Sequence, residues 1–166
     1  MTRTYGAAMH DDLDFFAATM KLGEFAVLDL DAMMLLHRVE LSGDAFYQAL
    51  ADRVSNAEAA ELLRRNGREE TGHARRIRRA MTIKMGDDWE APADLDVPFA
   101  VSVPDEISLE LFDVIVQAEL GGDAGYQAWA DAETDPEIQR LLLLNGREET
   151  IHGERAQAAR ALIAGA

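Results

Sequence analysis

The 166-residue sequence contains no cysteine. This absence excludes disulfides, thiolate-bound zinc, cysteine nucleophiles and cysteine-held iron–sulfur clusters. No uninterrupted apolar run approaches the ~18–20 residues of a transmembrane helix. Residues 1–12 turn acidic before any apolar stretch forms, so we expect no secretory signal. A reducing cytoplasm is therefore the default compartment, with no membrane partner.

Basic residues are also scarce. The chain has 16 Lys and Arg against 31 Asp and Glu, which gives a formal net charge of −15. A nucleic-acid backbone needs Lys and Arg contacts, so this balance disfavours nucleic acid as a partner. An acidic surface favours the approach of cations, or it serves solubility alone. With 48% hydrophobic residues, the chain is long enough to bury the core of one domain.

The second half of the chain repeats the first. Residues 39–80 align with residues 118–159 without a gap at an offset of 79, and 22 of the 42 positions are identical. A shared helical periodicity does not produce that much identity. The sequence therefore predicts a domain built by duplication.

Each half is typical of a helical hairpin, the first over residues 28–85 and the second over residues 105–164. Apolar residues recur at helical spacing in both, and no segment shows the alternation of a strand. The expected helix starts and turns lie at capping residues: Asp29 or Asp31, Ser55-Asn56, Asp105 or Ser108, and Thr134-Asp135-Pro136.

The segment between the hairpins, residues 86–104, contains Pro92, Pro98 and Pro104, a density that blocks a helix. About 20 extended residues cross the length of a bundle at ~3.3 Å per residue. We therefore predict an all-α fold, a ferritin-like four-helix bundle of two duplicated hairpins joined by a long crossover, over residues 28–166. Residues 1–27 form an N-terminal segment, in which residues 11–25 are expected to make a short extra helix.

The repeat keeps three chemically notable pairs. Two of them form an E-x-x-H motif in each half, whose carboxylate and imidazole share one face of a helix. The third pair consists of one further glutamate in each half. Each lies on the side of its helix that carries apolar or small residues, so we predict that its side chain points inward. The pairs are Glu40 with Glu119, Glu70 with Glu149, and His73 with His152.

Four buried carboxylates are costly unless they are paired or bind metal, because like charges at close range raise one another's pKa. Two divalent cations cancel four negative charges, and two neutral imidazoles complete the ligand set. This is the general pattern of di-iron and di-manganese carboxylate bundles. The alternative is a duplicated surface of ion pairs with Arg68, Arg76, Arg147 or Arg155, but such pairs contribute only ~0–1 kcal/mol and need no histidine. Iron is the first choice of metal, with manganese or zinc possible.

At these residues the sequence resembles the ferritin-like superfamily, especially rubrerythrins and bacterioferritins, over residues 28–164. The resemblance implies that Glu70 and Glu149 bridge the two metals. It also implies a role for Tyr47 and Tyr126, which lie seven residues after a ligand glutamate, as candidate catalytic residues. The implied metal ligands are Glu40, Glu70, His73, Glu119, Glu149 and His152.

The sequence departs from both families at particular positions. Rubrerythrins carry a further glutamate where this chain has Gly122, and a glutamate where it has His152. Bacterioferritins carry a haem methionine where this chain has Thr71, so no haem is expected. The missing cysteines exclude a rubredoxin module, and electrons must then come from an external donor.

Further polar residues lie close to the motifs. Asp44 and Asp123 either accept a hydrogen bond from the distal nitrogen of a metal-bound histidine or are ordinary polar residues. Tyr47 and Tyr126 either donate to a ligand carboxylate, supply an electron or simply pack. His37 has valine at its repeat position and is expected to be a satisfied structural histidine.

The resulting functional hypothesis is a di-iron oxidoreductase that reduces O₂ or hydrogen peroxide while Fe(II) is oxidised, as a ferroxidase or a peroxidase. Two alternatives remain open from the sequence. One is an oxygenase or hydroxylase that acts on an organic substrate at the same centre. The other is a non-catalytic iron-binding protein. The expected assembly is a homodimer.

Overall fold

The computed structural model describes residue 10 and residues 12–165, and these contain five helices and no strand. The all-α prediction is thus confirmed for this part of the chain. Residues 1–9 and 11 of the predicted N-terminal segment lie outside the described residues. The helices are α1 (Phe15–Leu22), α2 (Leu30–Arg53), α3 (Ala57–Met85), α4 (Leu109–Ala132) and α5 (Pro136–Ala164).

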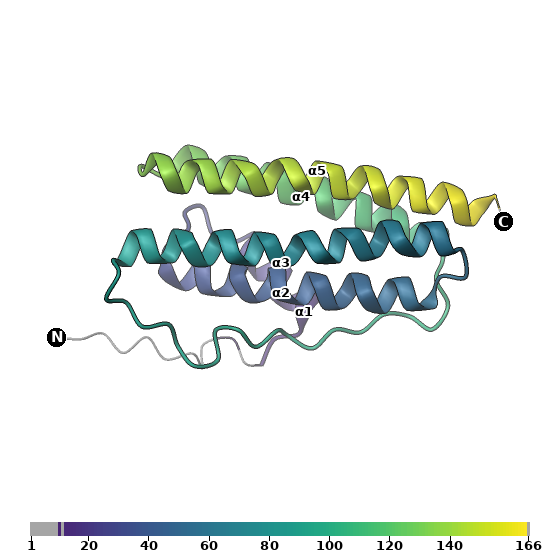
Figure 1. Ribbon diagram of the computed structural model, residues 1–166, viewed down its shortest axis with the longest axis horizontal. Coiled ribbons are helices and arrows are strands. Elements are labelled where there is room, and N and C mark those ends of the chain that lie inside the picture. Colours follow the sequence, from purple (N-terminus) through teal and green to yellow (C-terminus); the bar gives the residue numbers. More distant parts are fainter. Residues whose placement is uncertain (1–9, 11, 166) are drawn as a thin grey trace.

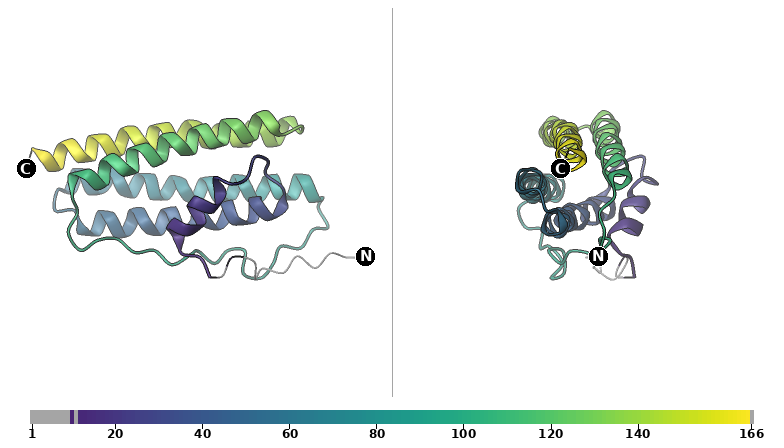
Figure 2. Two further views of the ribbon diagram at one scale, coloured as in Figure 1. Left: turned by 180° about the vertical axis from the view of Figure 1, so that it is seen from behind. Right: turned by 90° about the vertical axis from the view of Figure 1, so that its right-hand side faces the viewer.

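The four long helices form two hairpins (Figure 1). Seen along the bundle, α2 and α3 make one layer and α4 and α5 the other, with α1 beside α2 (Figure 2). The layers meet where α3 packs against α5, whereas α2 and α4 make no close backbone contact with each other. None of these helices has the length and apolar character that crossing a bilayer requires.

Capping side chains begin the helices close to the positions that the sequence predicts. The side chains of Asp29, Asn56, Ser108 and Asp135 accept hydrogen bonds from backbone N–H groups in the first turns of α2, α3, α4 and α5 respectively. Pro136 occupies the first turn of α5, where its missing N–H costs nothing. Each hairpin therefore has a defined register, which places its E-x-x-H motif midway along the bundle.

The apolar core is divided into two clusters, one toward each end of the bundle. The first includes Met33, Ile77 and Leu142, and the second includes Leu63 and Phe112. All five of these side chains are inaccessible to solvent. The polar residues of the repeated motifs lie between the clusters, so burial on both sides separates them from water.

The crossover that follows α3 runs along the outside of the first hairpin to the start of α4 (Figure 1). Asp96 binds it to this hairpin, because its carboxylate accepts hydrogen bonds from Arg78 at 2.7 and 2.5 Å. The Nε2 of His37 lies 2.8 Å from the same carboxylate, and its Nδ1 lies 2.8 Å from the carbonyl oxygen of Ala74. His37 is thus the satisfied structural histidine that the sequence favours.

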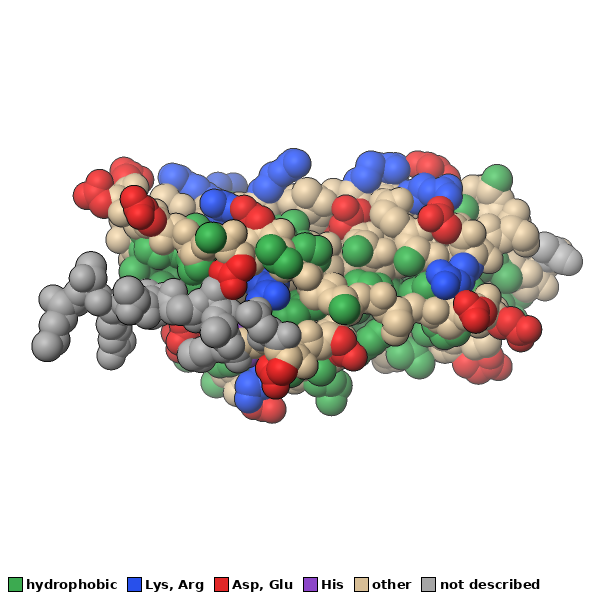
Figure 3. Space-filling view, turned by 90° about the horizontal axis from the view of Figure 1, so that it is seen from below, with side chains coloured by type: hydrophobic (Ala, Val, Ile, Leu, Met, Phe, Trp, Pro, Cys, Tyr) green, Lys and Arg blue, Asp and Glu red, His purple; other side chains and the backbone are tan. Residues whose placement is uncertain are grey.

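The face that carries α1 and the crossover has acidic side chains spread over its length and basic side chains gathered along one edge (Figure 3). Beneath this face, Phe99 of the crossover is buried. Its backbone N–H donates to the hydroxyl of Ser42 at 2.8 Å, and the guanidinium of Arg38 lies 4.1 Å above its ring. We conclude that Phe99 is one of the two buried apolar anchors of the crossover, the other being Leu95.

Replacing Phe99 should destabilise the protein. We expect Phe99→Ala to lower the free energy of unfolding by about 3–5 kcal/mol, because a buried phenyl ring is removed and a cavity remains. Urea denaturation followed by circular dichroism measures this change. The matched control Val97→Ala, at a side chain that is 51% exposed, should stay within about 0.5 kcal/mol of the wild type. Equal effects of both variants would contradict the anchoring role.

Candidate metal centre

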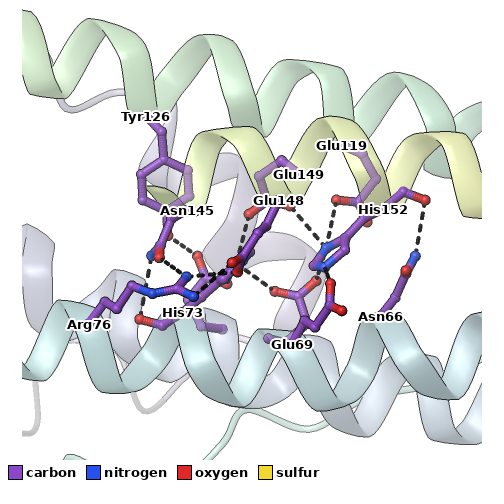
Figure 4. Close-up of polar contacts among 12 residues, drawn as sticks. Asn66, Glu69, His73, Arg76, Glu119, Tyr126, Asn145, Glu148, Glu149 and His152 are labelled. Atoms are coloured by element: carbon purple, nitrogen blue, oxygen red, sulfur yellow. Dashed lines mark hydrogen bonds and ion pairs between the residues drawn. The ribbon is translucent and has the colours of Figure 1, made fainter. Parts of the chain in front are cut away.

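Six side chains from four helices converge between the two apolar clusters. Each of the helices α3 and α5 supplies the glutamate and the histidine of its E-x-x-H motif, and α2 and α4 supply one glutamate each. Figure 4 shows His73, Glu119, Glu149 and His152 pointing into this space. Both histidines are inaccessible to solvent, and no carboxylate side chain is more than 11% exposed. The residues are Glu40, Glu70, His73, Glu119, Glu149 and His152.

These residues form two overlapping groups. In each group, one ligand atom per residue lies within 4.8 Å of all the others. Glu70 and Glu149 belong to both groups, so their carboxylates stand where two ions would share them. The first group adds Glu40 and His73, and the second adds Glu119 and His152.

The two histidines test whether a metal pair fits this centre. Nδ1 of His73 lies 3.2–3.3 Å from oxygens of Glu40, Glu70 and Glu149, and Nδ1 of His152 lies 3.3–3.8 Å from oxygens of the second group. Neither buried nitrogen has a well-directed hydrogen bond within the described residues. A buried polar atom without a partner is costly, and a cation bound through its lone pair would satisfy it. The donor set therefore fits two divalent cations.

The other ring nitrogen of each histidine contacts a carboxylate from the opposite hairpin. Nε2 of His73 donates to Glu148 at 3.0 Å, and Nε2 of His152 donates to Glu69 at 3.2 Å. Because a carboxylate accepts here, the proton is held on Nε2, and Nδ1 is left to bind a metal. Each half of the chain thus orients the histidine of the other half.

Two arginines hold these orienting carboxylates in place. Arg76 donates to both oxygens of Glu148 at 2.8 Å, and Arg155 donates to Glu69 at 2.7 Å. From the sequence, both arginines were also possible exposed partners of Glu70 and Glu149. That alternative is wrong, because the latter two carboxylates are buried among the histidines.

Of the two alternatives left open for Asp44 and Asp123, the one in which they accept hydrogen bonds from the histidines is wrong, because Glu148 and Glu69 do so. Their carboxylates accept hydrogen bonds from the threonine hydroxyls of the neighbouring helix, at 3.4 Å for Asp44 and 2.7 Å for Asp123. Close helix packing explains this, because a Cβ at Gly67 or Gly146 would lie only 2.8 or 2.7 Å from these carboxylates. Each aspartate is therefore held within its own hairpin.

Sequence reasoning missed the orienting residues although a signal for them exists. The run Asn-Gly-Arg-Glu-Glu-Thr occurs in both halves, followed by the histidine and, three residues later, by an arginine. Its first glutamate orients a histidine, and its asparagine accepts from the arginine, at 2.7 Å for Asn145 and 3.2 Å for Asn66. The identity of the whole run pointed to these contacts, but their partners lie across the bundle.

The two tyrosines also act across the hairpins. Tyr47 of α2 donates its hydroxyl hydrogen bond to Oε1 of Glu119, and Tyr126 of α4 donates to Oε1 of Glu40. The hydroxyl of Tyr126 also accepts from the side-chain amide of Asn145 at 3.0 Å. Both tyrosines are almost fully buried. Each therefore fixes one oxygen of a glutamate whose other oxygen faces a histidine.

Burial and mutual repulsion divide the carboxylates into two kinds. Burial, reinforced by the charge of Glu70, raises the pKa of Glu40 to about 8. Burial, reinforced by Glu149, also raises the pKa of Glu119 well above its ordinary value. Burial acts in the same direction on Glu70, but contacts with His152 and His73 outweigh it and hold its pKa far below the usual range. Without metal, the outer glutamates of the centre, Glu40 and Glu119, therefore keep their protons, and metal binding must displace these protons.

The fold and this buried cluster define a carboxylate-bundle metalloprotein of the ferritin-like kind. Residues 37–160, about three quarters of the chain, match the family model named Rubrerythrin. The chain belongs to the rubrerythrin family. No curated protein and no solved structure gives a significant match to it.

The titrating groups predict how the stability of the metal-free protein depends on pH. Glu40 has a folded pKa of about 8 against an ordinary 4.5, so its contribution is full below pH 4.5 and disappears toward pH 8. Contacts with Glu119, Glu149 and Glu70 outweigh burial and raise the pKa of His152 from 6.5 to about 12, so its contribution declines above pH 6.5. Hydrogen bonds from His73 and Arg76 hold the pKa of Glu148 at about 2, despite opposing burial, so its contribution is lost below pH 4.5.

We therefore expect the melting temperature of the chelated protein to be highest near about pH 5–6 and to fall on both sides. Thermal unfolding in a series of buffers measures this profile. Glu40→Gln should flatten the alkaline limb, because it removes one of the groups that ionise there. A melting temperature that rises steadily from about pH 5 to 8 would contradict the assignment.

The orienting carboxylates should control metal affinity. We expect Glu148→Ala to weaken metal binding by about 10–100-fold, because Nε2 of His73 loses its acceptor. Glu69→Ala should have a similar effect through His152. Competition with a coloured chelator measures the affinity. Glu137→Ala, which removes an exposed partner of Arg79, is the matched control, and an affinity loss no larger than that of this control would refute the orienting role.

Proposed function

We propose that the protein is a di-iron oxidoreductase that reduces O₂ or hydrogen peroxide as Fe(II) is oxidised. The observation that carries this proposal is the pair of overlapping ligand groups, each with its own buried histidine Nδ1 and both sharing Glu70 and Glu149. A bound iron pair supplies the redox chemistry, which no side chain of the cluster provides alone. Its electrons come from an external donor.

The protein's own residues supply geometry, charge and exclusion of water. The four glutamates balance the charge of two divalent ions. Glu69 and Glu148 keep the histidines in the tautomer that binds metal. Tyr47 and Tyr126 each hold one oxygen of a terminal glutamate, and the apolar clusters on both sides keep bulk water away. Such a preformed, dry site makes each electrostatic contact stronger than it would be in water.

The donor set supports iron as the first choice and manganese as the second. Four carboxylates and two imidazoles are ligands that suit these ions. Structural zinc more often takes four ligands, frequently including sulfur. We infer that the bundle arose by duplication of one hairpin, because both halves supply equivalent ligands, equivalent orienting residues and equivalent tyrosines.

The glycines beside the cluster support a small oxidant rather than an organic substrate. A Cβ at Gly43 would lie 3.2 Å from Cδ of Glu70, and a Cβ at Gly122 would lie 3.5 Å from Cδ of Glu149. The two shared carboxylates thus already occupy the space that these glycines leave. This favours O₂ or peroxide over the oxygenase alternative.

Anaerobic titration with Fe(II) tests the proposal. We expect two ions to bind per chain, and a pulse of peroxide or O₂ should then produce a new absorption as the oxidant is consumed. Glu70→Ala should abolish both, because it removes a ligand that both ions share. Glu137→Ala again serves as the control. Full iron loading without consumption of oxidant would instead support the non-catalytic alternative, and absence of loading would refute the metal centre.

A further inference from the structure

Two oxidisable aromatic rings lead from a ligand glutamate toward the outside of α4. Tyr126 donates its hydroxyl hydrogen bond to Glu40, and its ring meets the indole of Trp129 edge-on, with ring centroids 5.6 Å apart and planes at 85°. Such edge contacts are a favourable aromatic geometry. Trp129 is only partly buried, and its indole N–H donates to the carbonyl oxygen of Phe25 at 2.8 Å. The two rings thus form a continuous contact from the centre to a residue that solvent reaches.

The first half of the chain lacks this path. Tyr47 donates to Glu119 as Tyr126 does to Glu40, but the position that corresponds to Trp129 holds Leu50, which is fully buried. The ring that meets Tyr47 edge-on is that of Phe46, with centroids 5.6 Å apart, and a phenyl ring is far harder to oxidise than an indole. Leu50 also shows that packing at this position needs no indole.

We propose that Trp129 and Tyr126 carry single electrons between an external donor and the metal centre. The proposal rests on the proposed function for its electron acceptor. Tyr126 is 1% exposed, so a donor in solution cannot reach it directly, whereas Trp129 lies at the outer end of the contact. The donor is a one-electron reductant, such as a reduced flavin or iron–sulfur protein.

The transfer balances in electrons and protons. While O₂ or peroxide is being reduced at the centre, Tyr126 gives one electron toward it, and its phenolic proton moves along the existing hydrogen bond to Oε1 of Glu40. This oxygen is available because the other oxygen, Oε2, is the one that faces His73. Trp129 then gives one electron to the phenoxyl radical, which takes the proton back. The indole radical cation keeps its N–H on the carbonyl of Phe25 and takes one electron from the donor.

Pulse radiolysis tests the contact without relying on iron chemistry. The chain has two tryptophans and three tyrosines, so a background with Tyr5→Phe and Trp89→Leu leaves only Trp129, Tyr47 and Tyr126. The full chain is loaded with Zn(II), which neither gives nor takes an electron here, and azide radicals oxidise the tryptophan. We expect the indolyl absorption to decay as a phenoxyl absorption rises, in a first-order phase independent of protein concentration. In this phase an electron moves from Tyr126 to the oxidised Trp129, which is the reverse of the direction proposed for the enzyme.

Matched variants locate the path. Tyr126→Phe should abolish the phase, whereas Tyr47→Phe should retain it. Trp129→Leu, which copies Leu50 of the first half, should remove the slow appearance of the phenoxyl radical even if Tyr126→Phe does not fold. Absence of the phase in the background protein, or its persistence in Tyr126→Phe, would overturn the proposal.

Two measurements separate this proposal from the proposed function. The phase in the Zn(II)-loaded protein needs neither iron nor an oxidant of iron, so it reports on the aromatic pair even where iron loading gives no turnover. In the iron-loaded protein supplied with peroxide, Trp129→Leu should slow the oxidation of ascorbate with the iron content unchanged. An unchanged rate of ascorbate oxidation would overturn the role of Trp129 as the point where electrons enter.

Discussion

The constraint on which the structure depends is the concentration of four carboxylates inside an apolar bundle. Their burial is unfavourable unless positive charge is placed among them. In the metal-free protein, protons on the outer glutamates and on the histidines supply it, as the raised pKa values of Glu40 and His152 indicate. Two divalent ions would replace those protons. The centre can therefore exchange bound protons for bound divalent metal ions.

The contacts around the centre cross between the hairpins. Glu148 of α5 orients His73 of α3, and Tyr126 of α4 holds Glu40 of α2. The equivalent contacts run in the opposite direction from the first hairpin to the second. Docking of the two layers is therefore what completes the site, and the closest docking contact is the one between α3 and α5.

The local features of the fold could be read from the sequence because they depend on neighbouring residues. Caps such as Asn56 and Asp135 and the prolines of the crossover act over a few positions, and the E-x-x-H spacing fixes which residues share a helix face. The inward glutamates could be found because the repeat preserves them on the apolar side of their helices.

The cross-bundle contacts could not be read in the same way. The partner of His73 is 75 positions away, and its identity depends on how α3 lies against α5. From the sequence, Asp44 was one open candidate because it is one turn from a ligand, but Thr71 holds it within its own hairpin. Trp129 likewise has no counterpart in the repeat, so comparing the halves could not assign it a role before its ring contact was known.

The reciprocity of these contacts has a consequence for how such a centre arises. Around the centre, each residue of the second hairpin that orients a ligand of the first, or supports an orienting residue, has an identical counterpart in the first hairpin, such as Asn66, Glu69 and Arg76. Two copies of a single ancestral hairpin, related by a two-fold axis, would hold the complete set of ligands and orienting groups. Under the duplication that we propose, fusion of the copies would free each half to diverge, and a tryptophan on one side alone is an asymmetry that a pair of identical chains could not acquire.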